Sequence, residues 1–203
     1  FIDTSLQFFY VDNIGANSLE PTSGPSSGGT KVIIRGSNFE YSDSLACQFG
    51  LHHDVPASWL SPYALSCISP QQQDAGDVEI RITGNAVDYS NETLKFQYHE
   101  PIKVQTVFPL YGPVTGNTTI VITGTGYLDS PSFRCQFDGS ITPLVAFLND
   151  THVLCSSPAH APGRVCVETS NNGVDFTADC VPFSYYTEAV VESLSPNHGP
   201  RSG

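Results

Sequence analysis

The stretch PTSGPSSGGT, Pro21 to Thr30, decides the organisation of this 203-residue chain, because it recurs. It returns as PLYGPVTGNT from Pro109 to Thr118, and its beginning returns as PNHGPRSG from Pro196 to Gly203. The first two copies lie 88 residues apart and the last two lie 87 apart. Glycine and proline in such clusters are typical of turns that open a new element. A motif repeated at this constant spacing predicts an array of similar structural units.

Three further markers keep the same register. They are an aromatic F-x-Y motif 13 residues before each opening proline, a pair of cysteines 20 residues apart, and a loop-like N-x-V-D motif. Their positions are FFY at Phe8, FQY at Phe96 and FSY at Phe183; Cys47 with Cys67 and Cys135 with Cys155; GNAVDYS around Asn85 and NNGVDFT around Asn172. We therefore place the last strand of one unit at residues 1–18, whole units at 19–100 and 101–187, and the start of another at 188–203.

Each whole unit is predicted to be all-β. KVIIRG and TIVITG are β-branched runs that end at glycine, and FRCQF (133–137), LACQF (45–49) and DVEIRI (77–82) alternate apolar and polar residues. This alternation is typical of strands with one buried face. About seven short strands in such a unit predict an immunoglobulin-like sandwich of two sheets.

The combined motifs resemble the IPT/TIG domain (immunoglobulin-like, plexin, transcription factor). The matching features are P-x-x-G-P-x-x-G-x-T, then G-x-N-F at Gly36 or G-x-G-Y at Gly124, then C-x-F, C-x-x-P and the closing F-x-Y. The resemblance covers essentially the whole chain. It implies tandem immunoglobulin-like β-sandwiches of the early set, used as modules in cell-surface proteins.

Six cysteines form an even set that the repeat divides into pairs. Two pairs recur at equivalent positions, so each is expected to close within its own unit. The remaining two stand where the earlier unit has Glu79 and Thr93, and we expect them to bond to each other. The predicted disulfides are Cys47–Cys67, Cys135–Cys155 and Cys166–Cys180. Zinc is disfavoured because the cysteines are 11 or more residues apart and the histidines are scattered, and disulfides indicate an oxidising compartment.

Three N-x-[ST] sequons fit a protein of the secretory pathway. They begin at Asn91, Asn117 and Asn149, and each predicts an N-linked glycan, with an unmodified surface asparagine as the alternative. The chain shows neither an apolar run long enough to span a bilayer nor a signal peptide. We expect a membrane connection only through segments outside it.

The net charge of −12, with only eight Lys and Arg residues, argues against nucleic acid as a partner. No nucleophile elbow, phosphate loop or calcium loop is present, so we expect no enzyme activity, no cofactor and no metal site. Calcium between units is an alternative that the sequence leaves open. His52 and His53 are interpreted as loop histidines, and Trp59, which aligns with Phe147, as a core or inter-sheet aromatic.

These observations predict a non-enzymatic extracellular spacer and protein-interaction segment within a tandem array, in a surface receptor or adhesin. The expected partners are neighbouring repeats, a surface ligand or filament subunits, and N-linked glycans. One alternative is a structural repeat of an extracellular filament or of a flagellar or cell-wall appendage. Another is an accessory module of a secreted carbohydrate-active enzyme. The apolar joins between units favour a semi-rigid rod.

Overall fold

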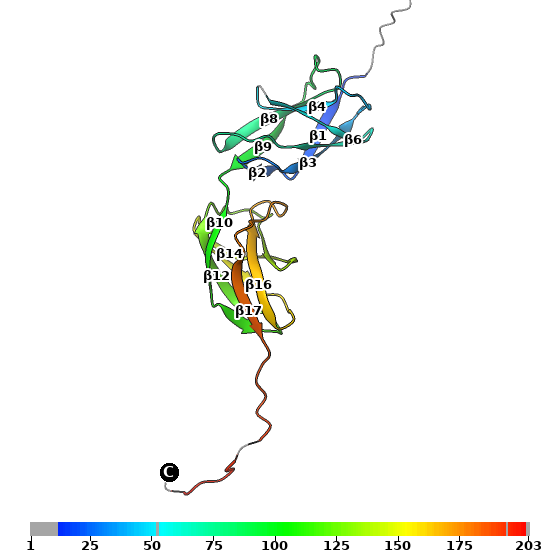
Figure 1. Ribbon diagram of the computed structural model, residues 1–203. Helices are drawn as coiled ribbons and strands as arrows, with labels where there is room; N and C mark the ends of the chain where they lie inside the picture. Colours follow the sequence, from blue (N-terminus) through cyan, green and yellow to red (C-terminus); the bar gives the residue numbers. More distant parts are fainter. Residues whose placement is uncertain (1–11, 52, 194, 202–203) are drawn as a thin grey trace, which may run out of the picture.

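The computed structural model of the chain describes residues 12–51, 53–193 and 195–201. These residues contain strands and turns but no helix, so the all-β prediction is confirmed. The same residues hold no helix that is long and apolar enough to cross a membrane. Two sandwiches follow one another along the chain, and Figure 1 shows them arranged end to end.

The first sandwich is built from nine strands in two sheets. One sheet has the order β1-β3-β7-β6 and the other has the order β2-β9-β8-β4-β5. The strands are β1 (Gly15–Glu20), β2 (Ser23–Pro25), β3 (Lys31–Ser37), β4 (Ala46–Phe49), β5 (His53–Pro56), β6 (Ser58–Ser61), β7 (Ala64–Ile68), β8 (Gly76–Thr83) and β9 (Leu94–His99).

The first strand crosses the boundary that we drew between residues 18 and 19. β1 pairs antiparallel with β3, with Leu19 opposite Ile34, and its Ala16 and Leu19 are buried in the core of this sandwich. Residues 15–18 therefore pack with the first sandwich. The FFY motif at residues 8–10, where we placed the end of a preceding unit, lies outside the described residues.

The second sandwich repeats the strand arrangement of the first, except at one strand. Strand β14 is continuous: its first half pairs with β13 and its second half pairs with β15, so both sheets share it. In the first sandwich the chain leaves the strand at Ala57, which splits the equivalent segment into β5 and β6. The strands are β10 (Lys103–Phe108), β11 (Tyr111–Pro113), β12 (Thr119–Thr125), β13 (Arg134–Phe137), β14 (Ser140–Asn149), β15 (His152–Ser156), β16 (Gly163–Ser170) and β17 (Val181–Tyr186).

Each sandwich has its own hydrophobic core, so each is a separate structural unit. The inward-facing residues that the alternation predicted are buried: Leu45, Cys47, Phe49, Ile80, Ile82, Phe133, Cys135 and Phe137. The F-x-Y motifs place aromatic rings edge to face, with ring centres 5.0 Å apart in both Phe96–Tyr98 and Phe183–Tyr185. This geometry is the one that aromatic pairs prefer.

Disulfides join the two sheets of each sandwich. The structure contains the three pairs expected from the repeat: Cys47–Cys67 between β4 and β7, Cys135–Cys155 between β13 and β15, and Cys166–Cys180 between β16 and the residue before β17. The first two pairs have Cα–Cα distances of 6.4 and 6.5 Å, as expected for equivalent positions. The third pair occurs only in the second sandwich and fastens the segment that leads into its last strand.

Candidate functional site at the joint between the sandwiches

The connection between the sandwiches is short. Residues 100–102 alone separate β9 from β10. On the first side the backbone N–H of Ser26 donates to the carbonyl of His99 at 2.7 Å. On the second side the backbone N–H of Val104 donates to the carboxylate of Asp179 at 2.8 Å. Both ends of the connection are therefore fastened to their own sandwich.

A loop of the second sandwich reaches back across this connection. It lies between β16 and β17, and we call residues 172–175 its Asn–Asp loop. The side-chain oxygen of Asn172 accepts the backbone N–H groups of Val174 at 3.0 Å and Asp175 at 2.9 Å. The amide nitrogen of Asn172 donates to the carboxylate of Asp175 at 2.7 Å. An asparagine that bonds the backbone two residues on folds such a loop by itself.

The loop contacts the opening motif of the first sandwich through two hydrogen bonds. The amide nitrogen of Asn172 donates to the backbone carbonyl of Ser23 at 2.8 Å. The hydroxyl of Thr30 donates to the carboxylate of Asp175 at 2.7 Å. Thr30 is fully buried and Asn172 is 7% exposed, so water is largely excluded from these bonds. Hydrogen bonds to an ionised carboxylate are among the stronger ones in proteins.

Asn171, next to this loop, ties the joint to the second sandwich. Its side chain accepts the N–H of Leu128 at 3.1 Å and donates to the carbonyl of Gly126 at 2.9 Å. The ring of buried His99 lies against it, with Nδ1 3.5 Å from the Asn171 amide nitrogen. The carbonyl of Glu100 is 2.9 Å from the same Nδ1. A carbonyl oxygen can only accept a hydrogen bond, so Nδ1 of His99 carries the imidazole proton and donates it to Glu100. Because a protonated Nδ1 cannot also accept from the Asn171 amide, the contact between these two nitrogens is a packing contact.

Two hydrogen bonds therefore join the sandwiches directly, from Thr30 to Asp175 and from Asn172 to Ser23. Each of these two bonds matches a donor to an acceptor, and their side chains lie on loops next to paired strands. A family model described as IPT/TIG domain matches residues 16–98 and 101–185 of the chain. The chain belongs to the IPT/TIG family. Its two sandwiches are two tandem IPT/TIG domains, as the resemblance implied.

Plexins are among the relatives found in known proteins. Plexin-A4 of Mus musculus is 27% identical over 216 residues, and human Plexin-A2 is 27% identical over 212 residues. Each alignment takes in 97% of this chain but only 11% of the plexin, so the chain spans about a tenth of these relatives. A solved structure described as the full extracellular region of Plexin A4 superposes with a TM-score of 0.56, at 24% identity, over 92% of this chain and 17% of that one. That superposition supports the tandem fold.

The family, the plexin relatives and three disulfides indicate an extracellular segment of a cell-surface protein. The three sequon asparagines lie on the surface of the IPT/TIG domains. Asn91, Asn117 and Asn149 are all exposed, as glycosylation requires.

Among the described residues, the histidines form no metal-ligand cluster. His52 lies outside the described residues, and His53 begins β5. His160 stacks on Tyr185, with ring centres 5.0 Å apart. Within residues 12–51, 53–193 and 195–201 no three His, Cys, Asp or Glu residues come together as metal ligands.

The prediction for Trp59 was wrong. Phe147, with which it aligns, packs against the core of the second IPT/TIG domain. Trp59 is instead 38% exposed, and its indole N–H donates to the carbonyl of Phe39 at 2.8 Å. The cause is the break at Ala57, which separates β6 from β5 and lets the indole lie at the surface.

Sequence reasoning did not identify the joint. The N-x-V-D motif around Asn172 and the threonine at the end of the opening motif were both used only as markers of the repeat. One signal could have identified them: the polar residues of the opening motif and of the N-x-V-D motif recur in register in both units although they form no catalytic pattern. Alternating strand patterns do not explain such residues, and contact between neighbouring domains does.

Proposed function

We propose that the chain is a non-enzymatic, semi-rigid spacer and protein-interaction segment in the ectodomain of a plexin-like cell-surface receptor. The observation that carries the proposal is the Thr30–Asp175 joint, which fastens one IPT/TIG domain to the next through buried polar contacts. A segment built this way transmits distance and orientation between parts of a receptor. Its loops and exposed sheet faces provide the surface for protein contacts.

Further features belong to the same proposal. Glycans on Asn91, Asn117 and Asn149 would cover parts of the surface, and the three disulfides would stabilise the domains outside the cell. The net charge of −12 favours protein partners over nucleic acid. The domain at 19–100, extended at its start by β1, and the domain at 101–187 would be consecutive members of a longer array, in which one unit ends before β1 and another starts within 188–203.

A fractionation experiment tests this function against its alternatives. The full-length protein is expressed in cells and detected with an antibody against the 203-residue chain. If the chain is part of a receptor, the antibody stains intact cells and the protein stays with the membranes after alkaline carbonate extraction. Recovery in an insoluble polymer would support the filament alternative, and recovery in the medium with glycan-cleaving activity would support the accessory module of a secreted enzyme.

A further inference from the structure

The first IPT/TIG domain carries its own copy of the loop that forms the joint. In this copy, residues 85–88, the side-chain oxygen of Asn85 accepts the N–H groups of Val87 at 3.0 Å and Asp88 at 2.8 Å. The amide nitrogen of Asn85 donates to the carboxylate of Asp88 at 2.9 Å. These are the internal bonds of the Asn–Asp loop at 172–175, so the 85–88 loop has the docking conformation although no neighbouring domain contacts it within the described part of the chain.

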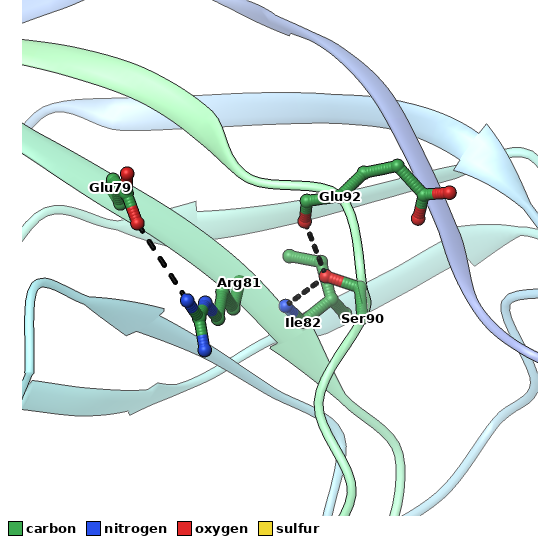
Figure 2. A network of polar contacts seen from close by, with 5 residues as sticks. All are labelled: Glu79, Arg81, Ile82, Ser90 and Glu92. Atoms are coloured by element: carbon green, nitrogen blue, oxygen red, sulfur yellow. Dashed lines mark hydrogen bonds and ion pairs between the residues drawn. The ribbon is translucent and has the colours of Figure 1, made fainter.

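The base of the loop is held in the same way in both domains. In the first domain the hydroxyl of Ser90 accepts the backbone N–H of Ile82 at 3.2 Å and donates to the carbonyl of Glu92 at 2.9 Å, as Figure 2 shows. In the second domain the hydroxyl of Thr177 accepts the N–H of Thr169 at 3.3 Å. Both loops are therefore presented by a fixed strand.

The same view shows the Glu79–Arg81 ion pair, with 3.7 Å between its charged atoms, on the outer face of β8 (Figure 2). Both of its side chains are exposed, and the pair makes no contact with the hydroxyl of Ser90. It therefore takes no part in holding the loop.

Burial separates the two loops. At the joint Asn172 is buried and Val174 is 52% exposed. In the first domain Asn85 and Asp88 are exposed and Val87 is 75% exposed. Because the conformations match, the difference reflects the neighbouring domain that only one of the loops contacts.

The receiving half of the joint shows the same contrast. Thr30 is fully buried beneath Asp175. Its counterpart Thr118 is partly exposed, and its hydroxyl has no hydrogen-bond partner among the described residues. Tyr111, the counterpart of Ser23, is exposed as well. The residues that the structure describes thus contain one complete joint, an open loop on the first domain and an open receiving turn on the second.

We propose that the 85–88 loop is a docking site for the opening turn of another IPT/TIG domain, which precedes this chain in the full-length protein. Asn85 would donate to a backbone carbonyl of that turn, and Asp88 would accept from the threonine that ends its P-x-x-G-P-x-x-G-x-T motif. In the same way, Thr118 and the carbonyl of Tyr111 receive the Asn–Asp loop of a domain that follows. This inference rests on the proposed function, in which the chain is part of a longer array.

The sequons near these surfaces are compatible with docking. Asn91 corresponds to Ala178, which is exposed although the 172–175 loop is docked. Asn117 corresponds to Gly29, where an added Cβ would meet nothing within 4 Å in the complete joint. The positions equivalent to both asparagines are therefore open in the complete joint.

Carboxyl footprinting compares the 203-residue chain with the full-length ectodomain. Both samples are deglycosylated, labelled with a water-soluble carbodiimide and glycine ethyl ester, and analysed by peptide mass spectrometry. We expect the labelling of Asp88 to fall several-fold in the ectodomain, to the level of Asp175, while exposed Asp77 is labelled equally in both. Equal labelling of Asp88 in the two samples would overturn the proposal.

Disulfide trapping identifies the occupant in the ectodomain. In one variant, Asp88→Cys is combined with a cysteine in the preceding domain, in place of the threonine that ends its opening motif. In the control variant, Thr30→Cys is combined with Asp175→Cys, which are the equivalent positions of the joint seen in the structure. Cross-linking of both pairs supports the proposal. Cross-linking of the control pair alone, or protection of Asp88 by a domain of another family, contradicts it. If trapping succeeds but the full-length protein does not fractionate with membranes, the receptor function is rejected while the docking of the 85–88 loop stands.

Discussion

The hydroxyl of Thr30 in the first IPT/TIG domain donates to the carboxylate of Asp175 in the second, across 2.7 Å and 145 residues of sequence. Thr30 ends the opening motif of one domain, and Asp175 ends the N-x-V-D motif of the next. The joint is therefore made between two motifs that both recur. A bond of this kind to a charged group typically contributes about 1.5–3 kcal/mol.

Removal of the threonine hydroxyl should weaken the joint while preserving the domain. We expect Thr30→Val to lower the free energy of unfolding of the chain by about 1.5–3 kcal/mol, with little further loss when Asp175→Ala is added. Denaturant titration of the two single variants and the double variant measures this coupling. Thr118→Val is the matched control, because its hydroxyl has no carboxylate partner among residues 12–51, 53–193 and 195–201. Equal losses for Thr30→Val and Thr118→Val would contradict the assignment.

Gly24 should be intolerant of a side chain because it lies against the same threonine. A Cβ at Gly24 would collide with the Thr30 hydroxyl and lie 2.9 Å from the Phe96 ring, and one at Gly112 would lie 2.6 Å from the Thr118 hydroxyl. We expect each alanine variant to destabilise its own domain by about 1–3 kcal/mol through overpacking. Only Gly24→Ala should also loosen the joint, which X-ray scattering would detect as a broader range of molecular dimensions. Loosening by Gly112→Ala would contradict this account.

The third disulfide should stabilise only the second domain. Cys166 and Cys180 are 14 residues apart in sequence. For a loop of this length, the chain-entropy model gives a stabilisation of about 3 kcal/mol. The double variant Cys166→Ala, Cys180→Ala should lower the unfolding free energy of the second domain by this amount. The first domain, which has Glu79 and Thr93 at these positions, should unfold unchanged. Free thiols at 166 and 180 in non-reducing peptide mapping of the natural protein would exclude the pairing.

Buried tyrosines should make the protein sensitive to alkaline pH. Burial raises the pKa of Tyr98 to about 12, and burial also raises the pKa values of Tyr127 and Tyr185. A raised pKa in the folded state means that the folded protein keeps protons that the unfolded chain loses near pH 10.

The stability that these buried tyrosines contribute is therefore present in full below pH 10, and this contribution is lost as the pH rises toward 12. For Tyr98 the loss approaches about 1.4 kcal/mol per pH unit within this window. Denaturant unfolding at pH 8, 10 and 11 measures it, and Tyr98→Phe should flatten the dependence. A variant with the unchanged slope would show that Tyr98 is not responsible.

The sequence predicted most of the fold because alternation and turn residues are local signals. Phe133, Cys135 and Phe137 were placed inward by their spacing alone, and they line the second core. Trp59 was misplaced because the strand break at Ala57 depends on how the whole sheet packs, which its neighbours in sequence do not encode.

The joint depended on a different kind of information. Asn172 and Asp175 are polar loop residues, and their local sequence predicts an Asx turn equally well with or without a neighbour. Their contacts with Ser23 and Thr30 arise from the direction in which the short connection aims one domain at the other. Repetition of the motif was visible in the sequence, but that orientation required the three-dimensional arrangement.

The most direct test of the account is whether the two domains share one orientation in solution. Residual dipolar couplings of the 203-residue chain, measured in a dilute aligned medium, report the alignment of each domain separately. The account predicts that one alignment tensor fits the natural protein and that Asp175→Ala requires two tensors of different magnitude. Two independent tensors in the natural protein would contradict a joint fixed by Thr30 and Asp175.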